Sequence, residues 1–220
     1  MNLPASAAQA LYLDIGWAIV LAAAVLALLG RRAGRPGVLA GVCGAIAIGM
    51  WLPAPWSPSF WLGMAFQYPS LMLVTLAGLS LLRRLAKPAP RAGAGTGPLL
   101  STLPAATLCL LAAALYAGAF AFVPYDPYAL GYLRFSGAAI ATLLALLWTW
   151  FDRRSAWSCL AVTVAATVHA GTRLPSGNAW DALFDPFLVA WAAFVVSCAL
   201  RDRLRRPSAA LITESIVERS

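Results

Sequence analysis

The feature that most constrains this chain is the alternation of long apolar runs with short segments rich in arginine. Hydrophobic residues make up 61% of the sequence and charged residues only 11%, which is too little charge to cover the surface of a soluble domain. A run of about 20 apolar residues is long enough to span a bilayer as a helix. The pattern therefore predicts an all-α fold, a polytopic membrane helix bundle with about seven transmembrane helices.

Seven apolar runs place the predicted helices. The second run is short and carries Gly41, Gly44 and Gly49, which suit close packing against a neighbour. The third contains Pro69, which is expected to kink the helix because proline removes a helical hydrogen bond. The predicted helices cover residues 11–29, 38–51, 58–82, 99–122, 127–150, 155–174 and 178–200.

The sequence allows two positions for the start of the last helix. If it starts near Asn178, Pro186 is an internal kink. If it starts at Asp185, only about fifteen residues remain before Arg201, fewer than the roughly 20 that a span needs. We therefore favour a start near 178, or a short interfacial helix followed by a tilted one.

The predicted helices form a single transmembrane domain, residues 1–206. Residues 88–98 are rich in Pro, Gly and Ala and are predicted to form a flexible cytoplasmic linker, the one candidate boundary between a front half and a back half. Residues 207–220 are predicted to be a flexible cytoplasmic tail.

The positive charge orients the predicted bundle. The net charge of +8 could indicate a nucleic-acid partner, but only Arg134 and Arg173 of the sixteen basic residues lie away from the ends of apolar runs. Basic residues at the ends of membrane helices stay on the cytoplasmic side. We therefore expect the N-terminus outside, the C-terminus inside, and contact with the lipid bilayer and not with nucleic acid. Because the chain is rich in arginine and almost free of lysine, we expect a multi-pass protein of the bacterial inner (cytoplasmic) membrane.

A short motif recurs at the outer ends of two predicted helices. Residues 125–128 and 184–187 both read aromatic-Asp-Pro-aromatic, and Ser57-Pro58 is a fainter version. An Asp or Ser side chain caps the free amides of a helix, and proline fits its first position. A duplicated helical hairpin would explain the repeat, as would chance recurrence. The aromatic residues in step are Tyr128, Tyr132 and Phe135 beside Phe187, Trp191 and Phe194.

The outer ends of the last helices also gather ionisable residues. Such groups are costly in a membrane unless they are paired or hydrated, so we expect a small polar pocket open to the outside. His169 and Asp185 are the catalytic candidates, because an imidazole and a carboxylate can move protons. The binding candidates are Arg134, Arg173, Asp126, Asp181, Asn178 and Gln67, with the arginines placed to hold an anionic headgroup. The predicted aromatic roof is Trp51, Trp56, Tyr125, Tyr128 and Trp180.

The same residues have structural interpretations. Asp126 and Asp185 are expected to cap helices, and Asn178 with Asp181 resembles a capping box. Arg173 can extend to lipid headgroups. His169 can serve as a packing residue, whereas Arg134 lies deeper and needs a partner, for which Asp126 or Asp185 is the candidate.

No cofactor or metal site is expected. The chain has one histidine, and its four cysteines each stand alone in an apolar run. Neither bis-histidine haem ligation nor a Cys-x-x-Cys zinc site is therefore encoded. Motifs of metalloproteases, serine hydrolases and phosphate-binding loops are also absent from the sequence.

Three functions follow from these patterns. The leading hypothesis is a non-catalytic accessory, assembly or interaction subunit, with a membrane-protein partner or a homo-oligomer, that docks through its outer polar cluster. The first alternative is an outer-leaflet enzyme acting on a lipid-linked or headgroup substrate. The second alternative is a transporter of a small solute or lipid, although ion-coupled transporters usually carry ionisable residues near the midplane and this chain does not.

Overall fold

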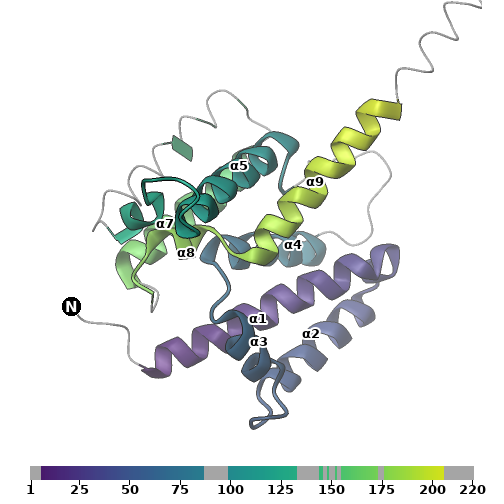
Figure 1. The fold of residues 1–220 in the computed structure, drawn as a ribbon. Coiled ribbons are helices and arrows are strands. Elements are labelled where there is room, and N and C mark those ends of the chain that lie inside the picture. Colours follow the sequence, from purple (N-terminus) through teal and green to yellow (C-terminus); the bar gives the residue numbers. More distant parts are fainter. Residues whose placement is uncertain are drawn as a thin grey trace, which may run out of the picture.

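The structure is a computed structural model that describes residues 6–86, 99–132, 144–145, 148, 152, 155–172 and 176–205. Every element of secondary structure within these ranges is a helix, so the all-α prediction is confirmed (Figure 1). The predicted linker and the predicted C-terminal tail lie outside the described residues. The helices are α1 (Ser6–Leu28), η1 (Gly30–Gly34), α2 (Pro36–Met50), α3 (Pro58–Phe66), α4 (Leu71–Ala86), α5 (Thr102–Ala119), η2 (Pro127–Tyr132), α7 (Ala156–Thr172), α8 (Ala179–Leu183) and α9 (Pro186–Arg205).

Two of the described helices, α1 and α5, are long and apolar enough to cross a membrane, with 23 and 18 residues. Only 28% and 33% of their apolar stretches are buried, so most of each helix surface faces outward. The core helix of a soluble protein buries its apolar face. The helices α2 and α7 are apolar but shorter. Length and composition thus support membrane association, and the seven spans stay a prediction.

The third predicted helix is interrupted, and the expectation of a kinked but continuous helix over 58–82 is wrong. It ends at Phe66, and a new helix begins at Leu71. Proline at 69 cannot continue a helical ladder and disfavours the helical conformation of the residue before it. Ser70 then starts the second piece, because its hydroxyl oxygen accepts a hydrogen bond from the amide of Leu73 at 3.1 Å.

The last predicted helix is also two helices, so the favoured continuous helix from 178 is wrong. The alternative of a short helix followed by a longer one matches the structure. Asn178 caps α8, and Pro186 occupies the first position of α9 instead of kinking a helix. Fifteen residues of α9 precede Arg201, as counted from the sequence, and the helix reaches 20 residues because it continues past Arg201 to Arg205.

The repeated motif marks helix starts, as its chemistry predicts. Ser57 accepts a hydrogen bond from the amide of Ser59, and Pro58 begins α3. Asp126 and Asp185 do the same before η2 and α9. The two capped starts lead into different helices, since η2 is a 3-10 helix and α9 is an α-helix. Duplication of a helical hairpin therefore stays a prediction.

The core joins the two interrupted regions. Helix α1 packs against α2, α3 and α4, while α5 packs along α9 and α4 along α7 (Figure 1). Trp17 of α1 is 1% exposed, and its ring meets those of Phe66 and Phe187 at centroid distances of 6.4 and 5.4 Å. This aromatic cluster ties the end of α3 to the start of α9. It thereby brings the break at 67–70 close to the break at 184–185.

Candidate functional site

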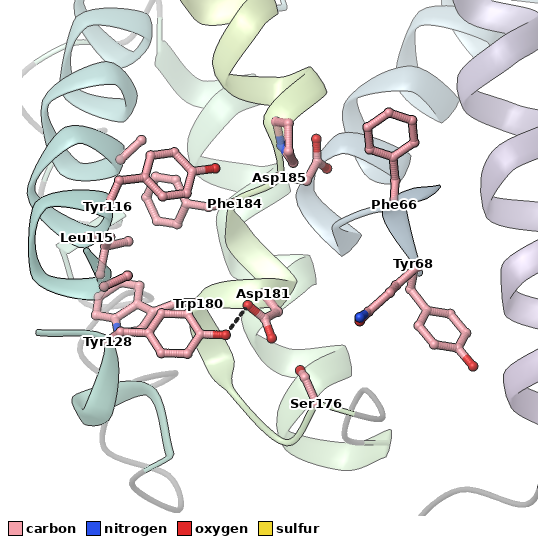
Figure 2. Close-up of a pocket in the computed structure, with 14 residues that line it drawn as sticks. Phe66, Tyr68, Leu115, Tyr116, Tyr128, Ser176, Trp180, Asp181, Phe184 and Asp185 are labelled. Carbon is pink, nitrogen blue, oxygen red and sulfur yellow. Dashed lines mark hydrogen bonds between the residues drawn. The ribbon is translucent and has the colours of Figure 1, made fainter. Parts of the chain in front are cut away.

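A cavity of about 310 Å³ opens where the two helix breaks meet α5, η2 and α8. Figure 2 shows Phe66 and Tyr68 on one side and Tyr116 and Tyr128 on the other, with the carboxylates of Asp181 and Asp185 between them. Its volume is at the lower end of the range for small-molecule sites. The lining residues are Phe66, Gln67, Tyr68, Ala112, Leu115, Tyr116, Ala119, Tyr128, Ser176, Trp180, Asp181, Phe184, Asp185 and Pro186.

Asp185 holds both helix breaks together. Its Oδ1 accepts a hydrogen bond from the amide of Leu188 at 2.8 Å, which caps α9 as predicted. Its Oδ2 accepts from the amide of Ser70 at 2.9 Å, at the start of α4. The side chain is only 8% exposed, and the positive ends of two helix dipoles stabilise its negative charge. The carboxylate is therefore a structural link as well as part of the cavity wall.

Asp181 presents a carboxylate oxygen to the cavity. Its Oδ1 accepts a hydrogen bond from the hydroxyl of Tyr128 at 2.6 Å (Figure 2). Tyr128 belongs to η2, so this hydrogen bond joins η2 to α8 across 53 residues of the chain. The predicted capping box is therefore incomplete: Asn178 caps α8, but Asp181 bonds to Tyr128 instead of completing the box.

Asn178 fastens α8 to η2 beside the cavity. It is fully buried, accepts from the amide of Trp180 at 2.9 Å, and donates from Nδ2 to the carbonyl of Tyr128 at 3.1 Å. The indole of Trp180 donates to the carbonyl of Pro127 at 3.1 Å. These contacts require Gly131, because a Cβ there would overlap the side-chain oxygen of Asn178. Asn178 thus positions two cavity walls without lining the cavity itself.

Gln67 lines the cavity from the first helix break. Its backbone has φ 60° and ψ −122°, a conformation that is rare for residues other than glycine. The carbonyl of Gln67 accepts a hydrogen bond from the indole nitrogen of Trp17 at 3.1 Å. A strained residue held in place from the core can mark a functional position.

Two of the other predicted site residues lie away from the cavity wall, and two lie outside the described residues. His169 lies buried in α7 and is not among the described residues that line the cavity. Asp126 caps η2 through the amide of Tyr128 at 2.9 Å and also stands apart from the cavity. Arg134 and Arg173 lie outside the described residues.

Of the predicted aromatic roof, Tyr128 and Trp180 line the cavity. Trp51, Trp56 and Tyr125 are strongly exposed and do not. Among the cavity residues that the predicted site did not include, Tyr116 stands among apolar residues without a local signal, whereas Phe184 had a signal as the first residue of the repeated motif at 184–187. Tyr68 also had a local signal, because it immediately precedes Pro69, which breaks the helix.

Comparison of the chain with known protein families, with characterised proteins and with solved structures gives no match. The function must therefore be argued from the residues themselves. Within the described ranges, no three His, Cys, Asp or Glu side chains gather in a way that could hold a metal ion.

Proposed function

We propose that this chain is a multi-pass protein of the bacterial inner membrane and acts as a non-catalytic accessory or assembly subunit. One observation carries the proposal: α2 exposes a continuous face of small residues that no other described part of the chain covers. At Gly37, Gly41 and Gly44, an added Cβ would meet no atom within 4 Å. The small residues of this exposed face are Gly37, Ala40, Gly41, Gly44 and Ala45, and the larger Ile48 follows them at its C-terminal end.

These positions recur at intervals of three and four residues, which places them on one stripe of the helix. In a bilayer, the lipid tails are as apolar as the helix, so association depends on close backbone contact between small residues. The sequence predicted that Gly41 and Gly44 pack against a neighbour. Since no described helix of this chain covers them, we assign that neighbour to a second polypeptide, either a partner subunit or another copy.

The exterior of the structure supports a membrane setting for this docking. Large apolar side chains are exposed on several helices, as lipid contact requires. Basic residues occupy the last turns of α4 and α9, and Arg32 and Arg35 flank α2. The C-terminal ends of α1 and α9 point the same way in Figure 1. The proposed topology keeps seven spans, the N-terminus outside and the C-terminus inside. Examples of the exposed apolar residues are Leu28, Ile48, Leu110, Phe194 and Leu204.

The catalytic alternative has less support. Both oxygens of Asp185 already accept backbone hydrogen bonds, and His169 is not among the described residues lining the cavity. A general base must reach the proton that it abstracts. If Asp185→Asn or His169→Ala abolished a turnover measured with purified protein while the fold persisted, the enzyme alternative would replace the leading proposal.

Native mass spectrometry of the full chain in lipid nanodiscs tests the proposed subunit role. We expect a complex of fixed stoichiometry that Gly41→Leu dissociates, because leucine separates the two backbones. Ala114→Leu is the matched control, since Ala114 is an exposed small residue on α5, away from the α2 face. A strictly monomeric wild-type chain, or a complex that survives Gly41→Leu unchanged, would contradict the proposal.

A transporter is the second candidate, and one observation favours it. Two interrupted helices meet at the same cavity, and the starts of α4 and α9 share one carboxylate. Discontinuous helices of this kind form the substrate sites of several transporter folds. Proteoliposomes that take up small amines or lipid analogues faster than empty liposomes would support transport, and equal rates would count against it.

A further inference from the structure

We propose that the cavity binds a primary alkylammonium group, carried either by a free amine or by a lipid headgroup. This inference goes beyond the proposed subunit role and does not require a partner on α2. It rests on three properties of the cavity: its aromatic walls, its two carboxylates and its acceptor oxygens.

Aromatic side chains make up a large part of the cavity walls. Six of the fourteen lining residues carry aromatic rings, and they come from the end of α3 and the first helix break, from α5 and η2, and from α8 and the second helix break. Rings therefore face the space from opposite sides (Figure 2). A cation near the face of such a ring is attracted to its negative charge distribution. The six residues are Phe66, Tyr68, Tyr116, Tyr128, Trp180 and Phe184.

The charge of the described walls is negative. Asp181 and Asp185 contribute two carboxylates, and none of the described lining residues is Lys, Arg or His. Neither carboxylate forms an ion pair with a described residue; the hydrogen bonds to Asp185 come from backbone amides, and that to Asp181 from a tyrosine hydroxyl. A carboxylate buried without a counter-charge favours a cation beside it. The anionic headgroup expected from the sequence depended on Arg134 and Arg173, which lie outside the described residues, so that expectation stays a prediction.

The free acceptor atoms select a primary amine. Asp181 uses only Oδ1 for Tyr128, so its Oδ2 has no hydrogen-bond partner among the described residues. Gln67 lines the cavity at the first helix break, and Ser176 lines the same space with a hydroxyl oxygen that accepts one hydrogen bond, from the amide of Asn178 at 3.3 Å, and keeps a second lone pair. A primary ammonium has three N–H donors that can use such acceptors, whereas a quaternary ammonium has none.

The Asp181 carboxylate offers the sharpest test of charge. Isothermal titration of butylammonium chloride into the full chain in phosphatidylcholine nanodiscs should show saturable binding, and neutral butanol should show none. Asp181→Asn keeps an oxygen for the Tyr128 hydroxyl but removes the charge, so we expect binding to weaken at least about tenfold. Asp126→Asn is the matched control, because this aspartate also contacts Tyr128 but does not line the cavity. The affinity of the Asp126→Asn variant for butylammonium should equal that of the wild type.

Tyr116 tests the aromatic wall independently, in case the Asp181 variant fails to fold. The Tyr116 hydroxyl forms no hydrogen bond with the described residues, so Tyr116→Phe should bind butylammonium as the wild type does. Tyr116→Leu keeps an apolar side chain but removes the ring, and we expect binding about threefold to tenfold weaker. Wild-type affinity in both Asp181→Asn and Tyr116→Leu, equal binding of butanol, or no binding to the wild type would each overturn the proposal.

The lipid composition distinguishes the two sources of the amine. If phosphatidylethanolamine fills the site, nanodiscs of that lipid should lower the apparent affinity for butylammonium by competition. If the ligand is a free amine, the affinity should be the same in both lipids. Either result supports the ammonium site and assigns its source. Because Gly41→Leu lies outside the cavity, it should leave butylammonium binding unchanged, so failure of the docking proposal and failure of this one are distinguishable.

Discussion

Helix α2 and the region around η2 and α8 use glycine in opposite ways. In α2, the space beside Gly37, Gly41 and Gly44 is empty. At Gly131 the missing side chain is replaced by Asn178 and Trp180, and at Gly118 by the ring of Pro127. Around η2 and α8, side chains of the same chain therefore occupy the space beside each glycine. On α2 that space is open, so a second helix can pack there. The same residue type closes the cavity wall in one place and leaves a docking surface in the other.

The largest effect should come from filling the closed region. Gly131→Ala forces the buried Asn178 side chain away from its bonds, and we expect a loss of about 3 kcal/mol in the free energy of unfolding. Gly41→Ala fills empty space on a helix and should stabilise the isolated chain by about 0.5 to 1 kcal/mol. Thermal unfolding in mild detergent measures both. Equal melting temperatures for the two variants would contradict the proposed difference between the closed region at Gly131 and the open face at Gly41.

The next effect concerns the carboxylate that links the helix breaks. Asp185→Ala leaves two backbone amides in a buried place without acceptors, so we expect a loss of about 2 to 4 kcal/mol. Asp126→Ala removes a single cap near the surface and should cost about 0.5 to 1 kcal/mol. Chemical unfolding of both variants in detergent gives the difference. Equal losses would mean that the bond to Ser70 contributes nothing.

A smaller effect should have the opposite sign. Gln67→Gly relieves a backbone conformation that glycine adopts easily, and we expect the melting temperature to rise, with a gain of about 1 kcal/mol. The same substitution removes an acceptor from the cavity and should weaken butylammonium binding. A Gln67→Ala variant is the control, because it removes the amide but keeps the strain. If Gln67→Gly is no more stable than Gln67→Ala, backbone strain is not stored at this break.

Local features of the chain were predictable from sequence where the physical cause is local. Asp126, Asp185 and Ser57 cap helices because a short polar side chain followed by proline suits a helix start in any context. The effect of Pro69 was underestimated, because a proline alone can either kink or end a helix. Its ring sits against Gly16 of α1, where a Cβ would collide with it. This contact joins residues that are far apart in the chain, so no local sequence pattern predicts it.

The candidate site was predictable only in part. Asp181 and Asp185 lie in one acidic, aromatic stretch, so their proximity follows from the sequence, whereas Gln67 and Tyr116 reach the cavity from distant segments. His169 stands one helical turn before Arg173 in the sequence, which made a shared pocket reasonable. The structure instead buries this histidine in α7, away from the described cavity wall.

The amino-acid sequence by itself determined the helical class, the apolar character of the exterior and the positions where helices start, since each depends on residues within a few turns of one another. The tertiary structure alone decided that the amide of Ser70 meets a carboxylate 115 residues away, and that rings from four segments surround one space. It also decided which glycines are covered and which are open. The reason is physical: capping and apolarity act through neighbours in the chain, while a cavity exists only where distant backbones cross and their side chains leave room.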